Sequence, residues 1–413
     1  MKRRFSRWTS LALTTVLVTG LTLSATAAHA AGGAIRIAVI APVAITPGKA
    51  LVDGARLAVD DINHAGGIDG RQVKLMVYDS KLSTTAAVRA MQKAVQQDHV
   101  VAVTGVFLSE AALALAPYAK RLDVPLIVES GTTRIGEMVH RHYQRYRNVF
   151  QLQLNSHFIA QEVCDAAHSL LVKGSGQPVS AVIMSEQAAW TKPLNRAYQQ
   201  CLPKAGVKVL QQISYAADTS DFGPIYNKIE RLKPTVIVTG MAHTGLRPVL
   251  QWHQDRVPAL MMGFNMQAGS GDFWARSNHA AQGLIVVTNG AGGAATTAKT
   301  PGFYRAYRER FKESPMLSAY TSYDAVQALA EAIRSSGSTR TGALVDQLEK
   351  LDMVGVTGRI RFYGRDARYT HALRYGKGLV TGVAFQWQAG RQTVIWPRGV
   401  AQGSLVYPDF VSH

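Results

Sequence analysis

Ser109 stands where a predicted helix begins, directly after the short loop that starts at Gly105. A hydroxyl at such a place can donate a hydrogen bond, and the first turn of a helix adds unpaired N–H groups and the positive end of its dipole. In a later loop, Gly131 lets a backbone donor approach closely and Thr132 adds a second hydroxyl. These residue types favour binding of an anion. The alternative is structural, with Ser109 as a helix N-cap and Thr133 as a turn residue.

The sequence motifs of common catalytic centres are absent. The chain has no His-Glu-x-x-His, Gly-x-Ser-x-Gly, phosphate-loop or zinc-type cysteine pattern. A catalytic site assembled from distant residues would leave no such trace, so an enzyme is the first rival interpretation. We expect a binding protein that uses no cofactor and no metal.

The first 30 residues have the pattern of a secretory signal peptide. Four basic residues among the first seven precede an apolar run over residues 11–23, and Ala28-His29-Ala30 supplies the small residues of a cleavage site. No later stretch approaches the roughly 20 apolar residues that a membrane-spanning helix needs. We therefore expect a periplasmic mature chain that begins near Ala31 and has no transmembrane segment.

The composition is basic, with a formal net charge of +18. Four of these positive charges lie in the predicted leader, which leaves +14 on the mature chain. Nucleic acid is not expected as a partner outside the cytoplasm, so a basic surface either attracts an anionic ligand or an acidic membrane partner, or serves solubility alone. The segment 134–147 is rich in arginine and histidine. We interpret it as a solvated surface, with an anion site or a partner-docking face as the alternative.

Two cysteines are too few for a disulfide framework and have no metal-ligand spacing. Cys164 and Cys201 fall on predicted helices that flank one strand. In an oxidising compartment either a disulfide between these helices or two separately buried thiols fits the pattern.

From residue 35 onward strands and helices alternate, which predicts parallel sheets covered by helices on both faces. Strands are expected at 35–40, 73–79, 100–103, 125–128, 179–184, 209–214, 235–238 and 283–287. The helix after the first strand carries apolar residues on one face from Leu51 to Ile62 and ends at Gly66. Further helices are expected to start near Ser83 and Ser109, to pass through Tyr198, and to cover 156–171, 222–232, 302–311 and 322–333.

The alternation restarts after about residue 150, which predicts an α/β protein of two doubly wound parallel-sheet lobes. Residues 31–149 and 288–355 form the first lobe, and residues 150–287 and 356–413 form the second. The chain would then cross between the lobes three times and make a hinge. Because open α/β sheets bind ligands beyond the carboxyl ends of their strands, we expect the site in the cleft between the lobes.

An ordered series of short motifs connects the chain with a known family. The motifs are residues 54–63, Gly66-Gly67-Ile68-Asp69-Gly70, Tyr78-Asp79, the turn from Gly105 to Ser109, Asp221-Phe222 and Tyr323-Asp324-Ala325. In these motifs the chain resembles the periplasmic type I solute-binding proteins of the branched-chain amino-acid-binding (leucine/isoleucine/valine) group of ABC transporters. The resemblance implies the two-lobed type I fold, a small-molecule ligand, a membrane permease of an ABC importer as partner, and lobes that close over the ligand. We expect a monomer. A periplasmic sensor or accessory subunit is the alternative, because closure also serves signalling.

The resemblance also implies roles for individual residues. In the family, the serine that closes the Gly-x-x-x-Ser turn and a threonine in the next loop hold the ligand carboxylate, and Ser109 and Thr133 match these positions. Trp190 matches an aromatic residue that covers the ligand, with a packing role as the alternative. Where amino-acid binders have a Met-Gly-x-Glu run, this chain has Met-Gly-Phe-Asn ending at Asn265. A neutral amide cannot form the ion pair with a ligand ammonium.

A tyrosine that the family has near Met241 is absent here, and His243 lies close by. With Phe107, Trp190 and Phe264, Met241 would make the cleft apolar. The predicted ligand-binding residues are Ser109, Gly131, Thr132, Thr133, Phe107, Trp190, Met241, His243 and Asn265. We expect a small carboxylate-bearing or amino-acid-like ligand, and more specifically a carboxylate with an apolar or aromatic body and no essential α-ammonium.

Overall fold

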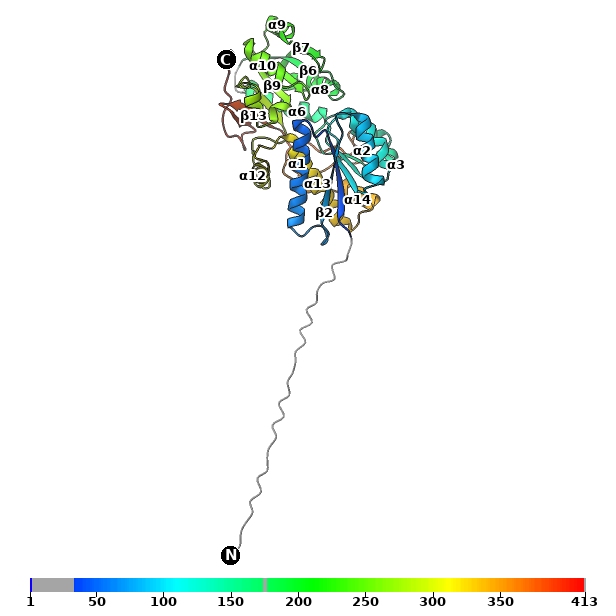
Figure 1. Cartoon of the computed structure of the whole chain (residues 1–413). Helices are drawn as coiled ribbons and strands as arrows, with labels where there is room; N and C mark the ends of the chain where they lie inside the picture. Colours follow the sequence, from blue (N-terminus) through cyan, green and yellow to red (C-terminus); the bar gives the residue numbers. More distant parts are fainter. Residues whose placement is uncertain (2–32, 174–176, 412–413) are drawn as a thin grey trace. The chain divides into compact units, whose positions relative to one another are not determined.

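The computed structural model describes residues 33–173 and 177–411, together with Met1. The predicted signal peptide (residues 1–30) lies outside the described residues except for Met1. From Gly33 onward the chain forms one compact unit (Figure 1). None of the described helices is long and apolar enough to cross a membrane.

The first sheet consists of five parallel strands in the order β2-β1-β3-β4-β5. The strands are β1 (Ile35–Ala41), β2 (Val73–Asp79), β3 (Ala102–Gly105), β4 (Leu126–Val128) and β5 (Val149–Gln151). The helices between them are α1 (Thr46–His64), α2 (Thr84–Gln96), α3 (Ser109–Arg121), α4 (Arg134–Arg141) and α5 (Tyr143–Tyr146). The first four strands were expected from their apolar runs, and Ser83 caps α2 as predicted by accepting a hydrogen bond from the Ala86 N–H (3.3 Å).

The second sheet has seven strands in the order β14-β13-β10-β9-β8-β6-β7. The strands are β6 (Val179–Glu186), β7 (Val207–Tyr215), β8 (Val236–Met241), β9 (Leu260–Asn265), β10 (Ile285–Thr288), β13 (Val383–Gln388) and β14 (Arg391–Trp396). The helices between β5 and β10 are α6 (Ser156–Ala167), which continues as a π-helical segment (His168–Val172), α8 (Thr191–Lys204), α9 (Gly223–Leu232), α10 (Leu246–Gln254) and α11 (Phe273–Arg276), with a short 3-10 turn (Gln267–Gly269) before α11. The two-sheet α/β fold class is confirmed. Two antiparallel strands, β13 and β14, extend the otherwise parallel second sheet at one edge and were not predicted.

The chain passes between the sheets three times. It leaves the first sheet after β5, leaves the second after β10, and returns to the second before β13. The intervening elements are α12 (Thr300–Phe311), α13 (Leu317–Ser336), α14 (Thr341–Glu349), β11 (Met353–Val354) and β12 (Arg359–Ile360). Helix α13 lies beside α1 (Figure 1), so the segment after β10 rejoins the first half of the chain. The exact lobe boundaries stay a prediction.

Asp324 fastens the third passage to α13. Its buried carboxylate accepts hydrogen bonds from the Val356 N–H (2.7 Å) and from the hydroxyl of Thr357 (2.7 Å). Burial raises the pKa of Asp324 to about 6, although these donors oppose the rise. The Tyr323-Asp324-Ala325 motif therefore has a structural use at the hinge.

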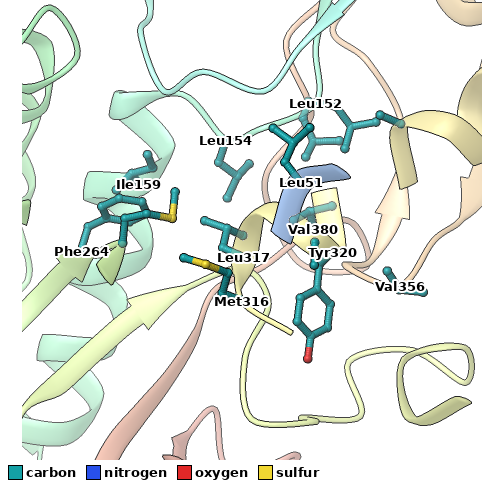
Figure 2. Packing of buried hydrophobic residues seen from close by; sticks show 14 of the residues in the cluster. Leu51, Leu152, Leu154, Ile159, Phe264, Met316, Leu317, Tyr320, Val356 and Val380 are labelled. Atoms are coloured by element: carbon teal, nitrogen blue, oxygen red, sulfur yellow. The ribbon is translucent and has the colours of Figure 1, made fainter. Parts of the chain in front are cut away.

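A single hydrophobic cluster fills the space where the passages meet. Figure 2 shows Leu154 of the first passage near Leu317 of α13. Leu51 of α1, Val356 of the third passage and Phe264 of β9 belong to the same cluster. All five side chains are buried. Each such burial contributes roughly 1.5–3 kcal/mol. The cluster also includes residues that line the cavity described next, so the hinge core and the candidate site share side chains.

The structure joins Cys164 of α6 to Cys201 of α8 by a disulfide with an S–S distance of 2.05 Å. The two helices pack against each other beside the second sheet. Of the two possibilities that the sequence left open, a disulfide or two separate thiols, the structure has the disulfide.

Candidate functional site

A cavity of about 400 Å³, including its open mouth, lies where the carboxyl ends of strands from both sheets meet. Its lining residues come from the loops after β3, β4, β6, β8 and β9 and from the first passage. They are Phe107, Leu108, Ser109, Glu110, Glu129, Gly131, Gln153, Ile159, Trp190, Ala242, His243, Phe264 and Met266. The location is the one that the topology predicts for a ligand site.

Most of the cavity wall is apolar. The rings of Trp190 and Phe264 meet edge to face with centroids 5.3 Å apart. Gly131 lies under Trp190: a methyl group in place of its hydrogen would meet the Trp190 ring at 3.8 Å and Ile159 at 3.4 Å. The glycine therefore keeps open a space that a larger side chain would fill.

Ser109 is the first residue of α3, and Leu108 is the N-cap. No side chain caps this helix, so the first-turn N–H groups have no side-chain acceptor. The alternative interpretation of Ser109 as an N-cap is wrong, because Leu108 is the residue with the extended backbone that precedes the helix. Ser109 thus lines the cavity together with a helix start that favours negative charge.

His243 supplies a positive charge at the cavity. Its Nδ1 lies 2.6 Å from Oε1 of the fully buried Glu186, whose other oxygen accepts the His243 N–H (2.8 Å) and the Thr244 hydroxyl (3.1 Å). The hydrogen bond to Glu186 raises the pKa of His243 above its usual value, against the effect of burial. Burial alone would raise the pKa of Glu186, but the hydrogen bonds and charge of His243 outweigh it and the pKa is lowered. Both shifts favour the ionised pair, in which a positively charged imidazole lies at the cavity.

Glu129 directly follows strand β4, and threonine hydroxyl groups lie next to its carboxyl. Its carboxyl oxygens accept from Thr321 (2.7 Å) and Thr104 (3.3 Å). Burial raises the pKa of Glu129 to about 8, although these donors oppose the rise. At neutral pH this carboxyl is therefore mostly protonated and uncharged.

Two further polar groups line the cavity. The buried side-chain Nε2 of Gln153 has no hydrogen-bond partner among the described residues, so it is a donor available to a ligand. Glu110 is exposed at the mouth, where its carboxylate accepts the Ala189 N–H (3.1 Å). This hydrogen bond joins α3 of the first sheet to the loop before α8 of the second.

The structure brings five of the predicted ligand-binding residues to the cavity: Phe107, Ser109, Gly131, Trp190 and His243. The other four do not line this cavity, and their part in ligand binding stays a prediction. The Thr132 hydroxyl accepts the Arg134 N–H (3.3 Å), and Thr133 lines a different groove.

Met241 and Asn265 are also not in the cavity lining. Met241 is fully buried in another hydrophobic cluster, which also contains Trp252 and Phe273. The amide of Asn265 donates to the Gly245 carbonyl (3.1 Å) and accepts the Ala268 N–H (3.1 Å). Because both ends of this amide are occupied by backbone, it orders the loop after β9.

The sequence interpretation did not identify Glu129, Gln153 or Glu186. Two of them share a signal that could have found them: Glu129 directly follows apolar strand β4 and Glu186 ends strand β6, each at the edge where ligands bind. A carboxylate at such a place is either solvated or held by specific partners. Gln153 lies in the first passage and had no such signal. No group of three or more metal-ligating side chains is present within residues 33–173 and 177–411.

A family model described as "Periplasmic binding protein" matches residues 34–379, most of the chain. The chain belongs to this periplasmic binding protein family. It is similar to "Leu/Ile/Val-binding protein homolog 3" of Brucella melitensis, with 26% identity over 77% of this chain and 83% of the relative. The family and this relative are binding proteins, so the chain is a solute-binding protein and not an enzyme.

Two solved structures of the same fold are similar to this periplasmic binding protein. A putative branched-chain amino acid ABC transporter protein from Silicibacter pomeroyi has a TM-score of 0.80 and 20% identity, over 92% of this chain and 100% of the other. An ABC transporter solute-binding protein from R. palustris in complex with benzoate has a TM-score of 0.73 and 17% identity, over 92% and 99%. Both confirm the type I fold.

Proposed function

We propose that this protein is exported to the periplasm on its N-terminal leader, captures a small organic carboxylate with an apolar body between its lobes, and delivers it to the permease of an ABC importer. One observation carries the ligand class: the His243 imidazolium shares an apolar cavity with the uncapped start of α3. A cation and a helix N-terminus attract a carboxylate, and aromatic walls favour an apolar body.

The cavity offers little to a ligand ammonium. Glu110 is exposed and already accepts a backbone N–H, and exposed carboxylates form weak ion pairs. Glu129 is mostly uncharged below about pH 8. Asn265 is occupied by backbone groups. The benzoate bound by the R. palustris neighbour supports an aromatic acid as one member of the ligand class, whereas the name of the Brucella relative supports aliphatic amino acids.

Titration calorimetry on the ligand-free mature chain separates these ligands. Leucine and 4-methyl-2-oxopentanoate have the same carbon skeleton and differ in the ammonium group, and benzoate tests the aromatic body. We expect the oxo acid to bind at least about tenfold more tightly than leucine, because it needs no ammonium partner. Tight leucine binding with no response to either carboxylate contradicts the proposed ligand class.

A pair of histidine variants tests the role of the cation. His243→Gln removes the charge but leaves the backbone N–H groups and Thr244 to hold Glu186. Since a hydrogen bond to a charged group contributes about 1.5–3 kcal/mol, carboxylate affinity should fall about tenfold or more. His140→Gln on the exposed face of α4 is the control and should not change the affinity. Equal affinities in all three proteins would exclude His243 as a ligand contact.

A further inference from the structure

A second concave site lies apart from the apolar cavity, and we propose that it binds a small oxyanion with two or more negatively charged groups. This basic groove has a volume of about 750 Å³. Its lining residues are Thr133, Arg134, Glu137, His157, Lys192, Pro193, Arg196, Ala197, Gln200, Arg368 and Tyr369. None of them lines the apolar cavity. The proposal does not depend on the proposed ligand class.

The groove carries an excess of positive charge that the protein does not neutralise. Its single carboxylate, Glu137, is paired with Arg368 (3.1 Å) and Arg141 (3.5 Å). Arg134, Lys192 and Arg196 form no ion pair with any described residue, although all three are exposed. Three cations around one hollow repel one another, so a bound anion would relieve the repulsion.

The cations come from elements of both sheets. Arg134 begins α4, which follows β4 of the first sheet, whereas Lys192 and Arg196 lie one turn apart near the start of α8, which follows β6 of the second. One singly charged oxyanion would leave two of these three cations without a counter-charge. This geometry fits a ligand with several charged groups, such as pyrophosphate or a tricarboxylate.

Backbone groups add to the positive potential. Neither N-cap residue, Thr133 of α4 or Trp190 of α8, makes a side-chain hydrogen bond to its helix. The Thr132 hydroxyl accepts the Arg134 N–H (3.3 Å), so the backbone contribution comes from the other first-turn N–H groups. The half-buried His157 is also sensitive to the groove: burial, and then the charge of Arg368, lower its pKa. His157 is thus a neutral imidazole that can donate one hydrogen bond without adding charge.

Four other arginines of the protein have counter-ions. Arg56, Arg147, Arg256 and Arg359 each pair with an aspartate within 3.2 Å. The arginine-rich segment 134–147 likewise divides. Arg141 and Arg147 are paired, whereas Arg134, which lines the groove, and Arg145, which lies over the Tyr146 ring, have no counter-ion among the described residues.

Calorimetry of the whole mature chain with sodium pyrophosphate, and separately with citrate, tests the proposal at ionic strength held constant with sodium chloride. We expect saturable binding of one anion per chain. Arg134→Gln and Arg196→Gln should each weaken it about tenfold, because each removes a charge-assisted hydrogen bond from a different side. Circular dichroism verifies that these exposed substitutions leave the fold intact.

Lys228→Gln and Arg231→Gln on α9 are matched controls, because they remove exposed positive charges one turn apart on another helix. They should leave the affinity within about twofold of the original. Absence of saturable binding at millimolar pyrophosphate and citrate overturns the proposal. So does equal weakening by the groove and control variants, which would mean that net charge alone attracts the anion.

Discussion

Glu129 allows a quantitative test of the electrostatics at the cavity floor. Its carboxyl is buried and accepts hydrogen bonds from the hydroxyls of Thr104 and Thr321, and no cation contributes to its pKa shift. The substitution Glu129→Gln keeps the shape and one acceptor oxygen but removes the titration. The effect of this change must therefore depend on pH in a way that the structure specifies.

The sign follows from the raised pKa. A carboxyl with a pKa of about 8 in the folded state and an ordinary value of 4.5 in the unfolded state binds its proton more tightly when folded. Its stabilising contribution is complete below about pH 4.5 and is lost as the pH rises through about 8. The pKa difference of about 3.5 units corresponds to about 5 kcal/mol in total, of which about 3 kcal/mol is already lost at pH 7.

Urea unfolding of the original chain and of Glu129→Gln, measured from about pH 5 to about pH 9, checks this value. The free energy of unfolding of the original chain minus that of the glutamine variant should fall by several kcal/mol as the pH rises across this range. Glu309→Gln, at an exposed residue of α12, is the control and should follow the original chain closely. If the Glu129→Gln and original curves run parallel, the carboxyl is not held neutral and the reasoning fails.

Three other predictions follow from the site and its supports. Gly131→Ala should fold normally, because the added methyl meets the Trp190 ring at an ordinary 3.8 Å, yet lower carboxylate affinity in calorimetry about tenfold by narrowing the cavity. Carboxylate affinity should be highest where His243 is protonated and fall as the pH rises above its raised pKa, whereas a flat profile up to about pH 9 would exclude an imidazolium contact. Replacing both Cys164 and Cys201 by serine opens a loop of 37 residues and should lower the free energy of unfolding by about 4 kcal/mol in urea titrations, and an unchanged midpoint would show that the disulfide constrains nothing.

Much of the fold was readable because its information is local. The strands of the first sheet are mostly short apolar runs between helices with a 3.6-residue apolar period, and their parallel direction follows from the alternation of strand and helix. Strand β5, only three residues long, gave too short a pattern to recognise. Strands β13 and β14 were missed because their place at the sheet edge depends on pairing with β10, almost 100 residues earlier.

The sequence predicted which loops form the candidate site but not which side chains of those loops point into it. Topology places the loops after β3, β4, β6 and β8 at one edge, which brings Ser109, Gly131, Trp190 and His243 to the cavity. Adjacent residues in a loop or strand end point in different directions, and the sequence does not say which. Thr132 and Met241 are therefore buried in other contacts, although each lies within two residues of a cavity residue.

The chemistry of the cavity depends on residues that act through others. The pKa of His243 is raised because Glu186, 57 positions earlier, lies against it in a buried network. A histidine alone would be as often neutral as charged near its ordinary pKa. Glu129, by contrast, has no such cation and is neutral. Glu129, directly after β4, and Glu186, at the end of β6, thus differ in charge state. The difference comes from their hydrogen-bond partners. We therefore expect pairs of residues, rather than the absence of a glutamate at position 265 alone, to set the ligand preference of this cavity.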